Sequence, residues 1–182
     1  MRIKLAPLGV LLLALLALGL RAQADVGVAW KTFTDPENRF SILMPTDPQV
    51  SSDSGPAGAA KPSYTSRIYI AREGANIYLA GITLYDVSSY NPSETSETIE
   101  KELAADRDNF NKQVKAHGTD GHRRQLDGHP ALEFKSSAPQ GNFSGLVVLV
   151  GSHCYMVVAA YRTPDEPAEA TKFLKSFKLI TP

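Results

Sequence analysis

Alternating apolar and polar positions dominate the chain beyond residue 29, and this period of two predicts β-strands. The clearest cases are 40–44, with Phe40, Ile42 and Met44 on one face, and the segment in which Leu132 and Phe134 alternate with charged neighbours. Two-residue periodicity puts successive side chains on opposite sheet faces, so one face of each strand is expected to be buried. Further strands are predicted at 30–34, 64–71, 77–85, 143–150 and 153–161, and a short one at 176–179.

Two segments show helical spacing instead. The first is predicted to open at 91–93, with Ser93 or Thr95 as its cap, and to end at His117-Gly118. Its apolar stripe consists of Ile99, Leu103, Phe110 and Val114. A second helix is predicted from Thr163-Pro164-Asp165, with Ala170, Phe173 and Leu174 on its apolar side. Runs of strands interrupted by single helices predict an α+β fold, with helices packed on an antiparallel sheet.

Residues 46–63 carry mostly Ser, Pro, Gly, Ala and Asp, and Val50 is their one large apolar side chain. Such a composition buries too little surface to offset the entropy of ordering the chain. The segment is therefore predicted to be a flexible loop.

The N-terminus has the plan of a secretory signal peptide. Arg2 and Lys4 precede an apolar run over 5–20, and Ala22-Gln23-Ala24 forms an A-x-A cleavage site. Residues 1–24 are predicted to be removed, which leaves 25–182 as a single domain in the periplasm or outside the cell. No second apolar run is long enough for a membrane span, so no stable membrane insertion is expected after signal removal.

The charge balance disfavours nucleic acid as a partner. Three of the 19 Lys and Arg residues (Arg2, Lys4 and Arg21) belong to the signal, whereas all 19 Asp and Glu residues lie after it. The mature chain thus carries three more acidic than basic residues, mixed in sign along the sequence. Binding to phosphates or to anionic lipid needs a concentrated basic face instead.

No local motif of catalysis is present. Gly141-Asn142-Phe143-Ser144-Gly145 has its serine one place late for a nucleophile elbow and is typical of a turn entering a strand. We expect no catalytic residue and no cofactor. The lone Cys154, among apolar neighbours, is expected to be a buried strand residue.

His122, His129 and His153 are the candidates for a metal site, although their spacing matches no standard ligand pattern. A metal site is therefore not expected, and polar surface histidines are the alternative. Five tyrosines crowd one region and could line a ligand groove, or simply border a sheet: Tyr64, Tyr69, Tyr78, Tyr85 and Tyr90.

Acidic residues of the first predicted helix, Asp106 among them, interleave with lysine and arginine. Such mixing of charges is typical of a solvated helix face. Calcium binding or acid–base chemistry by these carboxylates is the less favoured alternative.

Four segments carry a family resemblance. They are FTDPENRFSILMPTDPQ from residue 33, LDGHPALEFK from 126, VVLVGSHCYMVVAAY from 147 and ATKFLKSFKL from 170. Together they resemble secreted bacterial domains whose architecture is similar to PsbP, the extrinsic protein of photosystem II. The resemblance implies an α/β/α sandwich around an antiparallel sheet. It carries over no metal ligand and no catalytic residue to this chain.

These observations predict a non-catalytic secreted or periplasmic module that binds an envelope protein or a small ligand. Two alternatives stay open. A metal-handling protein would require the three histidines to converge, and a hydrolase would require a site assembled from distant positions.

Overall fold

An antiparallel sheet forms the centre of the protein in a computed structural model that describes residues 29–37, 39–55, 63–86, 95–118 and 121–180. Within these residues the sheet has seven strands in the order β3-β4-β5-β9-β8-β7-β6. Their bounds are β3 Gln49–Gly55, β4 Tyr64–Glu73, β5 Asn76–Tyr85, β6 Gly121–Leu126, β7 His129–Ala138, β8 Gly141–Val150 and β9 His153–Tyr161. Every pairing is antiparallel, which confirms the predicted sheet type.

The hairpin between β8 and β9 is confirmed. Val150 pairs with His153 across the two-residue turn Gly151-Ser152. Gly151 has φ of +54°, a left-handed conformation that glycine adopts without steric cost. Because β9 also pairs with β5, it lies at the middle of the sheet and joins its two halves.

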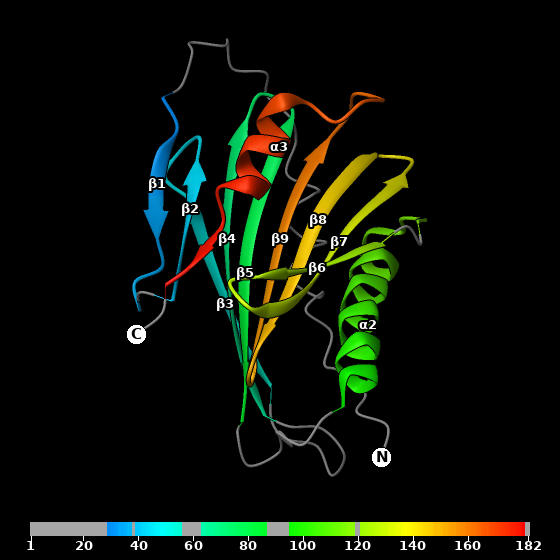
Figure 1. Cartoon of the computed structure of the whole chain (residues 1–182). Coiled ribbons are helices and arrows are strands. Elements are labelled where there is room, and N and C mark those ends of the chain that lie inside the picture. The colour runs from blue at the N-terminus through cyan, green and yellow to red at the C-terminus, as the bar shows by residue number, and fades with distance from the viewer. Residues whose placement is uncertain (1–28, 38, 56–62, 87–94, 119–120, 181–182) are drawn as a thin grey trace.

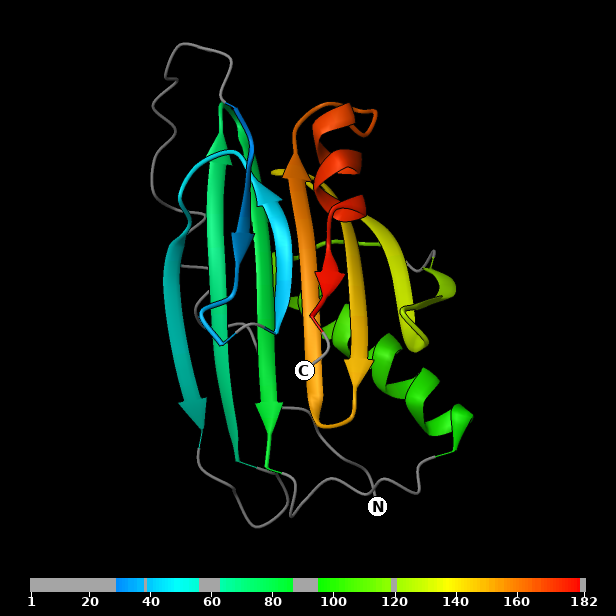
Figure 2. The same cartoon turned by 60° about the vertical axis from the view of Figure 1, so that its left-hand side comes forward.

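A small second sheet and one helix cover one face. β1 (Lys31–Thr34) and β2 (Phe40–Met44) form the predicted hairpin, and β10 (Lys178–Leu179) pairs with β2. Helix α3 (Ala168–Lys175) lies beside them on the same face (Figure 2). Aromatic side chains fill this layer: Tyr78 and Phe173 have ring centroids 5.1 Å apart. Their burial stabilises this layer, since each aromatic side chain removes a large apolar area from water.

Helix α2 (Ser96–Val114) covers the opposite face (Figure 1). Thr95 caps it through its side-chain oxygen, as one of the two predicted caps. Three residues of the predicted stripe, Leu103, Phe110 and Val114, are buried against the sheet. Helices thus lie on both faces, which confirms the predicted α+β, α/β/α arrangement.

The polar segment 46–63 contains a strand that its composition does not predict. Residues Gln49–Gly55 form β3 and pair with β4 over seven positions, from Gln49 opposite Ile70 to Gly55 opposite Tyr64. An edge strand gains its backbone hydrogen bonds from one neighbour and keeps its side chains in water, so it needs no apolar residues. Val50 is 57% exposed accordingly. The prediction of a loop was therefore wrong for 49–55, while 56–62 lie outside the described residues.

The end of α2 and the start of α3 differ from the prediction. Helix α2 ends at Val114, and the C-cap residue Lys115 takes a left-handed conformation with φ of 53°, so Gly118 lies beyond the helix end. Helix α3 begins at Ala168, and Thr163-Pro164-Asp165 precedes it. That segment folds into a turn in which Thr163 Oγ1 donates to the Asp165 carbonyl. A side chain that satisfies a nearby backbone group in this way competes with helix formation.

Within the described residues, no helix is both long and apolar enough to cross a membrane. The predicted signal peptide 1–24, with the predicted cleavage residues Ala22 and Ala24, lies outside the described part of the chain.

Candidate functional site

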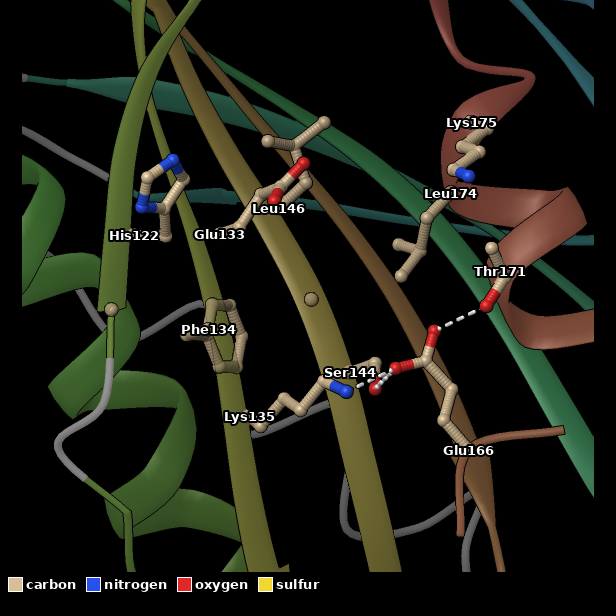
Figure 3. A pocket seen from close by; sticks show the side chains of 12 residues that line it. His122, Glu133, Phe134, Lys135, Ser144, Leu146, Glu166, Thr171, Leu174 and Lys175 are labelled. Atoms are coloured by element: carbon tan, nitrogen blue, oxygen red, sulfur yellow. Dashed lines mark hydrogen bonds and ion pairs between the residues drawn. The ribbon is translucent and has the colours of Figure 1, made fainter.

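A groove opens where α3 stops covering the sheet. Its volume is about 650 Å³, and it lies between α3 and the half of the sheet made by β6, β7 and β8 (Figure 3). This size falls within the range of small-molecule sites. The lining residues are Gly121, His122, Glu133, Phe134, Lys135, Ser144, Gly145, Leu146, Glu166, Thr171, Leu174 and Lys175.

Strand alternation decides which side chains line this groove. Glu133 and Lys135 of β7 are exposed, whereas Leu132 and Phe134 are buried under α2. This confirms the alternation predicted for the strand. Ser144 lies directly opposite Lys135 in the β7–β8 register, so a hydroxyl and an ammonium group share the groove floor.

Glu166, two residues before α3, connects the walls of the groove. Its Oε2 lies 2.7 Å from Lys135 Nζ and accepts a hydrogen bond of 3.0 Å from Ser144 Oγ. Its Oε1 accepts one of 2.8 Å from Thr171 Oγ1. Figure 3 shows the three partners converging on this carboxylate from β7, β8 and α3. The floor of the groove and the helix above it are therefore joined through one acidic side chain.

These contacts set the charge states. Burial alone would raise the pKa of the Glu166 carboxyl, but hydrogen bonds from Lys135, Thr171 and Ser144 outweigh it and the pKa is lowered. The same hydrogen bond and charge raise the pKa of Lys135. Ser144 Oγ also lies 2.9 Å from the Tyr161 hydroxyl. At neutral pH the groove therefore holds a carboxylate and an ammonium group in fixed charge states.

The rest of the lining is amphipathic. Leu146 of the sheet, 1% exposed, and the half-buried Leu174 of α3 face each other (Figure 3). Glu133 Oε1 lies 2.7 Å from Arg124 Nε of β6, a contact of opposite charges without hydrogen-bond alignment. Lys175, at the last turn of α3, is exposed. The groove thus offers an apolar strip bordered by charged groups.

The three candidate histidines lie on different strands. His122 of β6 pairs with Glu133, whereas His129, at the start of β7, pairs with Leu126. These two pairs lie four positions apart along the hairpin, about 13 Å at about 3.3 Å per residue. His153 begins β9, with β8 between it and β7. No group of three or more His, Cys, Asp or Glu side chains in the described ranges is placed to hold a metal ion. Of the three, only His122 lines the groove.

The tyrosines do not line this groove. Tyr69 and Tyr78 are fully buried in the aromatic layer, and Tyr64 donates a hydrogen bond to Asp53 of β3. Tyr85 belongs to the opposite face, under α2, and Tyr90 lies outside the described residues. Of the two alternatives, the described tyrosines border the sheet rather than line this groove, because strand alternation sends neighbouring tyrosines to opposite faces.

A buried polar contact lies under α2. Cys154 is buried as expected, but its Sγ donates to Asp106 Oδ2 at 3.1 Å. Desolvation raises the pKa of Asp106 to about 6. The prediction of a solvated helix face is therefore wrong for this side chain. Its place on the side of the apolar stripe, three residues after Leu103, is the signal in the sequence that points to its burial.

Comparisons with known proteins identify the fold and nothing beyond it. No protein-family model matches the chain, and no curated protein matches it. Among solved structures, the chain is similar to the solution structure of cyanobacterial PsbP (CyanoP) from Synechocystis sp. PCC 6803. The TM-score is 0.51 at 13% sequence identity, over 88% of this chain and 98% of that chain. The fold is therefore PsbP-like, as the sequence resemblance implied.

Proposed function

We propose that this chain is a non-catalytic binding module of the cell envelope, exported to the periplasm or secreted, which holds a small ligand or part of an envelope protein in the groove between α3 and β6–β8. The observation that carries this proposal is the groove itself, an amphipathic hollow of about 650 Å³ between α3 and the sheet. Ligand sites combine an apolar lining with a few placed polar groups in this way. The signal sequence at 1–24 supports export.

The chemistry of the groove favours binding over hydrolysis. A serine nucleophile needs a neighbouring base whose pKa lies near the working pH. Lys135 stands opposite Ser144, but its raised pKa keeps the amine protonated. Glu166 accepts the Ser144 hydrogen bond, but its lowered pKa makes it a weak base. These two groups act on each other and hold the groove in shape.

The metal-handling alternative receives no support from the arrangement of the histidines. The separation of His122 from His129 along the β6–β7 hairpin keeps them from sharing one ion, since Zn–N bonds of about 2.0–2.1 Å require ligands within a few ångströms of each other.

Blocking the groove tests the proposal. Leu174→Trp should fill the hollow from α3, and Glu169→Trp, at an exposed position on the same helix, is the matched control. We expect native mass spectrometry of the protein isolated gently from its envelope to show a bound ligand, or a protein partner, that is lost in Leu174→Trp and kept in Glu169→Trp. Equal retention by both variants would move the binding site elsewhere and overturn the proposal.

Catalysis is tested separately. Esterase, phosphatase and peptidase substrates should show no turnover above the level of Ser144→Ala. A turnover that this substitution abolishes, with folding intact by circular dichroism, would promote the hydrolase alternative.

A further inference from the structure

The polar groups of the groove differ in how far they are already paired. Both carboxylates have cationic partners: Glu166 has Lys135, and Glu133 has Arg124. Glu166 has in addition two hydroxyl donors. A cationic ligand group would therefore have to compete with contacts that are already formed. A buried or half-buried carboxylate with several donors is the poorer target for such a group.

The cationic groups keep free donor capacity. Lys135 carries three N–H donors, of which the Glu166 contact uses one, and its side chain is 69% exposed. Lys175 is exposed in the last turn of α3 and makes no ion pair or side-chain hydrogen bond within the described residues. His122 on the far wall is exposed in the same way. The open donors of the groove thus favour an anionic acceptor.

The apolar strip lies between these two ammonium groups. Figure 3 shows Lys135 toward one end of the groove and Lys175 toward the other, with Leu174 between them and Leu146 on the sheet across from α3. The methylene stems of both lysines extend this apolar surface, since lysine buries its stem while its charge stays in water. A ligand that fills the groove would place aliphatic carbon on Leu174 and an anionic group at one lysine.

We propose that the groove binds carboxylates carried on an aliphatic chain, with Leu174 contacting the chain over the buried floor at Leu146 and Lys175 contacting the carboxylate. The inference rests on the proposed function, whose binding site it shares, and adds the chemical class of the ligand. The Lys135–Glu166 bridge keeps its place in the complex, because the carboxylate takes N–H donors that Glu166 does not use.

Titrations followed by NMR of ¹⁵N-labelled protein test this chemistry with defined probes. Decanoate, below its micelle concentration, has both features, decyltrimethylammonium has the same chain with opposite charge, and acetate has the charge without the chain. We expect saturable shifts of the amide signals of Leu146, Leu174 and Lys175 with decanoate, and none at equal concentration with acetate. Decyltrimethylammonium should bind at least tenfold more weakly.

One lysine variant tests the contact with the carboxylate, and a second is its control. Lys175→Gln should weaken decanoate binding about threefold, the size expected for one solvent-exposed charge pair. Lys178→Gln, an exposed lysine on β10 outside the groove, should leave it unchanged. The weakening in Lys175→Gln should shrink at high salt, because ions screen exposed charges.

The outcomes separate the two proposals. Equal or tighter binding of decyltrimethylammonium at the same residues would overturn the carboxylate inference and leave the groove as a binding site. Absence of saturable decanoate shifts would also overturn it, while loss of the native ligand in Leu174→Trp would still uphold the proposed function. Decanoate shifts confined to residues outside the groove would count against the inference as well.

Discussion

Cys154 and Asp106, 48 residues apart in the chain, meet beneath helix α2, where the Cys154 thiol donates a hydrogen bond of 3.1 Å to the Asp106 carboxylate. Asp106 is 8% exposed and Cys154 5%. Burial raises the pKa of the carboxyl to about 6 and holds the pKa of the thiol well above its usual range. A lone charge in an apolar layer is costly. The Cys154 thiol gives the Asp106 carboxylate a hydrogen-bond donor in this layer and joins α2 to the central strand β9.

The raised pKa of Asp106 predicts a pH dependence of stability. The folded protein binds this proton more tightly than the unfolded chain, whose aspartate has its ordinary value of 3.8. Stability contributed by the protonated form is therefore complete below about pH 4 and is lost as the pH rises through about 6, by roughly 3 kcal/mol in total. Asp106→Asn removes this loss. The free energy of unfolding of this variant, relative to that of the wild type, should therefore rise as the pH increases from about 4 to above 6.

Urea unfolding at about pH 4 and about pH 7.5 measures the difference. The comparison between variants matters because other carboxylates, such as Glu166 with its lowered pKa, change stability in the opposite direction. Asp108→Asn, 60% exposed on the same helix, is the control and should track the wild type. A constant gap between Asp106→Asn and the wild type at both pH values would contradict the prediction.

The Cys154 thiol should be unreactive in the folded protein. Its high pKa leaves almost no thiolate at neutral pH, and the thiolate is the reactive form. Ellman's reagent should label about one thiol per chain in guanidinium chloride and a negligible fraction, at early times, under native conditions. Rapid labelling of the native state would mean that α2 leaves the sheet frequently.

Gly145 and Phe134 fit together under α2. A Cβ built on Gly145 would lie 2.2 Å from the Phe134 ring, closer than any van der Waals contact. Gly145→Ala should therefore destabilise the protein by about 1–3 kcal/mol through overpacking. A smaller side chain at position 134 should relieve the clash. Phe134→Leu is therefore expected to lower the free energy of unfolding less in the Gly145→Ala background than in the wild type.

A double-mutant cycle in denaturant melts tests this pair. Additive losses would show that the two positions do not share the same space. Gly74→Ala serves as a control for the intrinsic cost of adding a methyl group, since its Cβ would meet no heavy atom within 4 Å, although its positive φ adds strain of its own.

Processing of the N-terminus is expected before Asp25. The charged start, the apolar run and Ala22-Gln23-Ala24 together match a signal peptide. Intact mass measurement of the exported protein should give the mass of residues 25–182. A species that retains the apolar run at 5–20 would mean that this segment anchors the protein in the membrane instead.

Local periodicity by itself determines much of this fold. The alternation of Leu132 and Phe134 with charged residues places one face of β7 under α2, because the two-residue period is a property of the strand backbone itself. The β8–β9 hairpin follows likewise from Gly151-Ser152, and the cap of α2 from Thr95. Each of these features depends on residues that are neighbours in sequence.

The tertiary structure alone decided the groove, β3 and the contact of Asp106 with Cys154. Glu166 reaches Lys135 and Ser144 only because β9 returns the chain across the sheet to α3, and no local pattern encodes that distance. The polar segment 49–55 becomes a strand because the edge of β4 offers backbone partners, which its own composition does not record. The place of Asp106 beside the apolar stripe of α2 indicates its burial, but only the packing of α2 on the sheet brings it to Cys154. Sequence patterns report which face a residue takes, whereas packing of distant elements decides what that face meets.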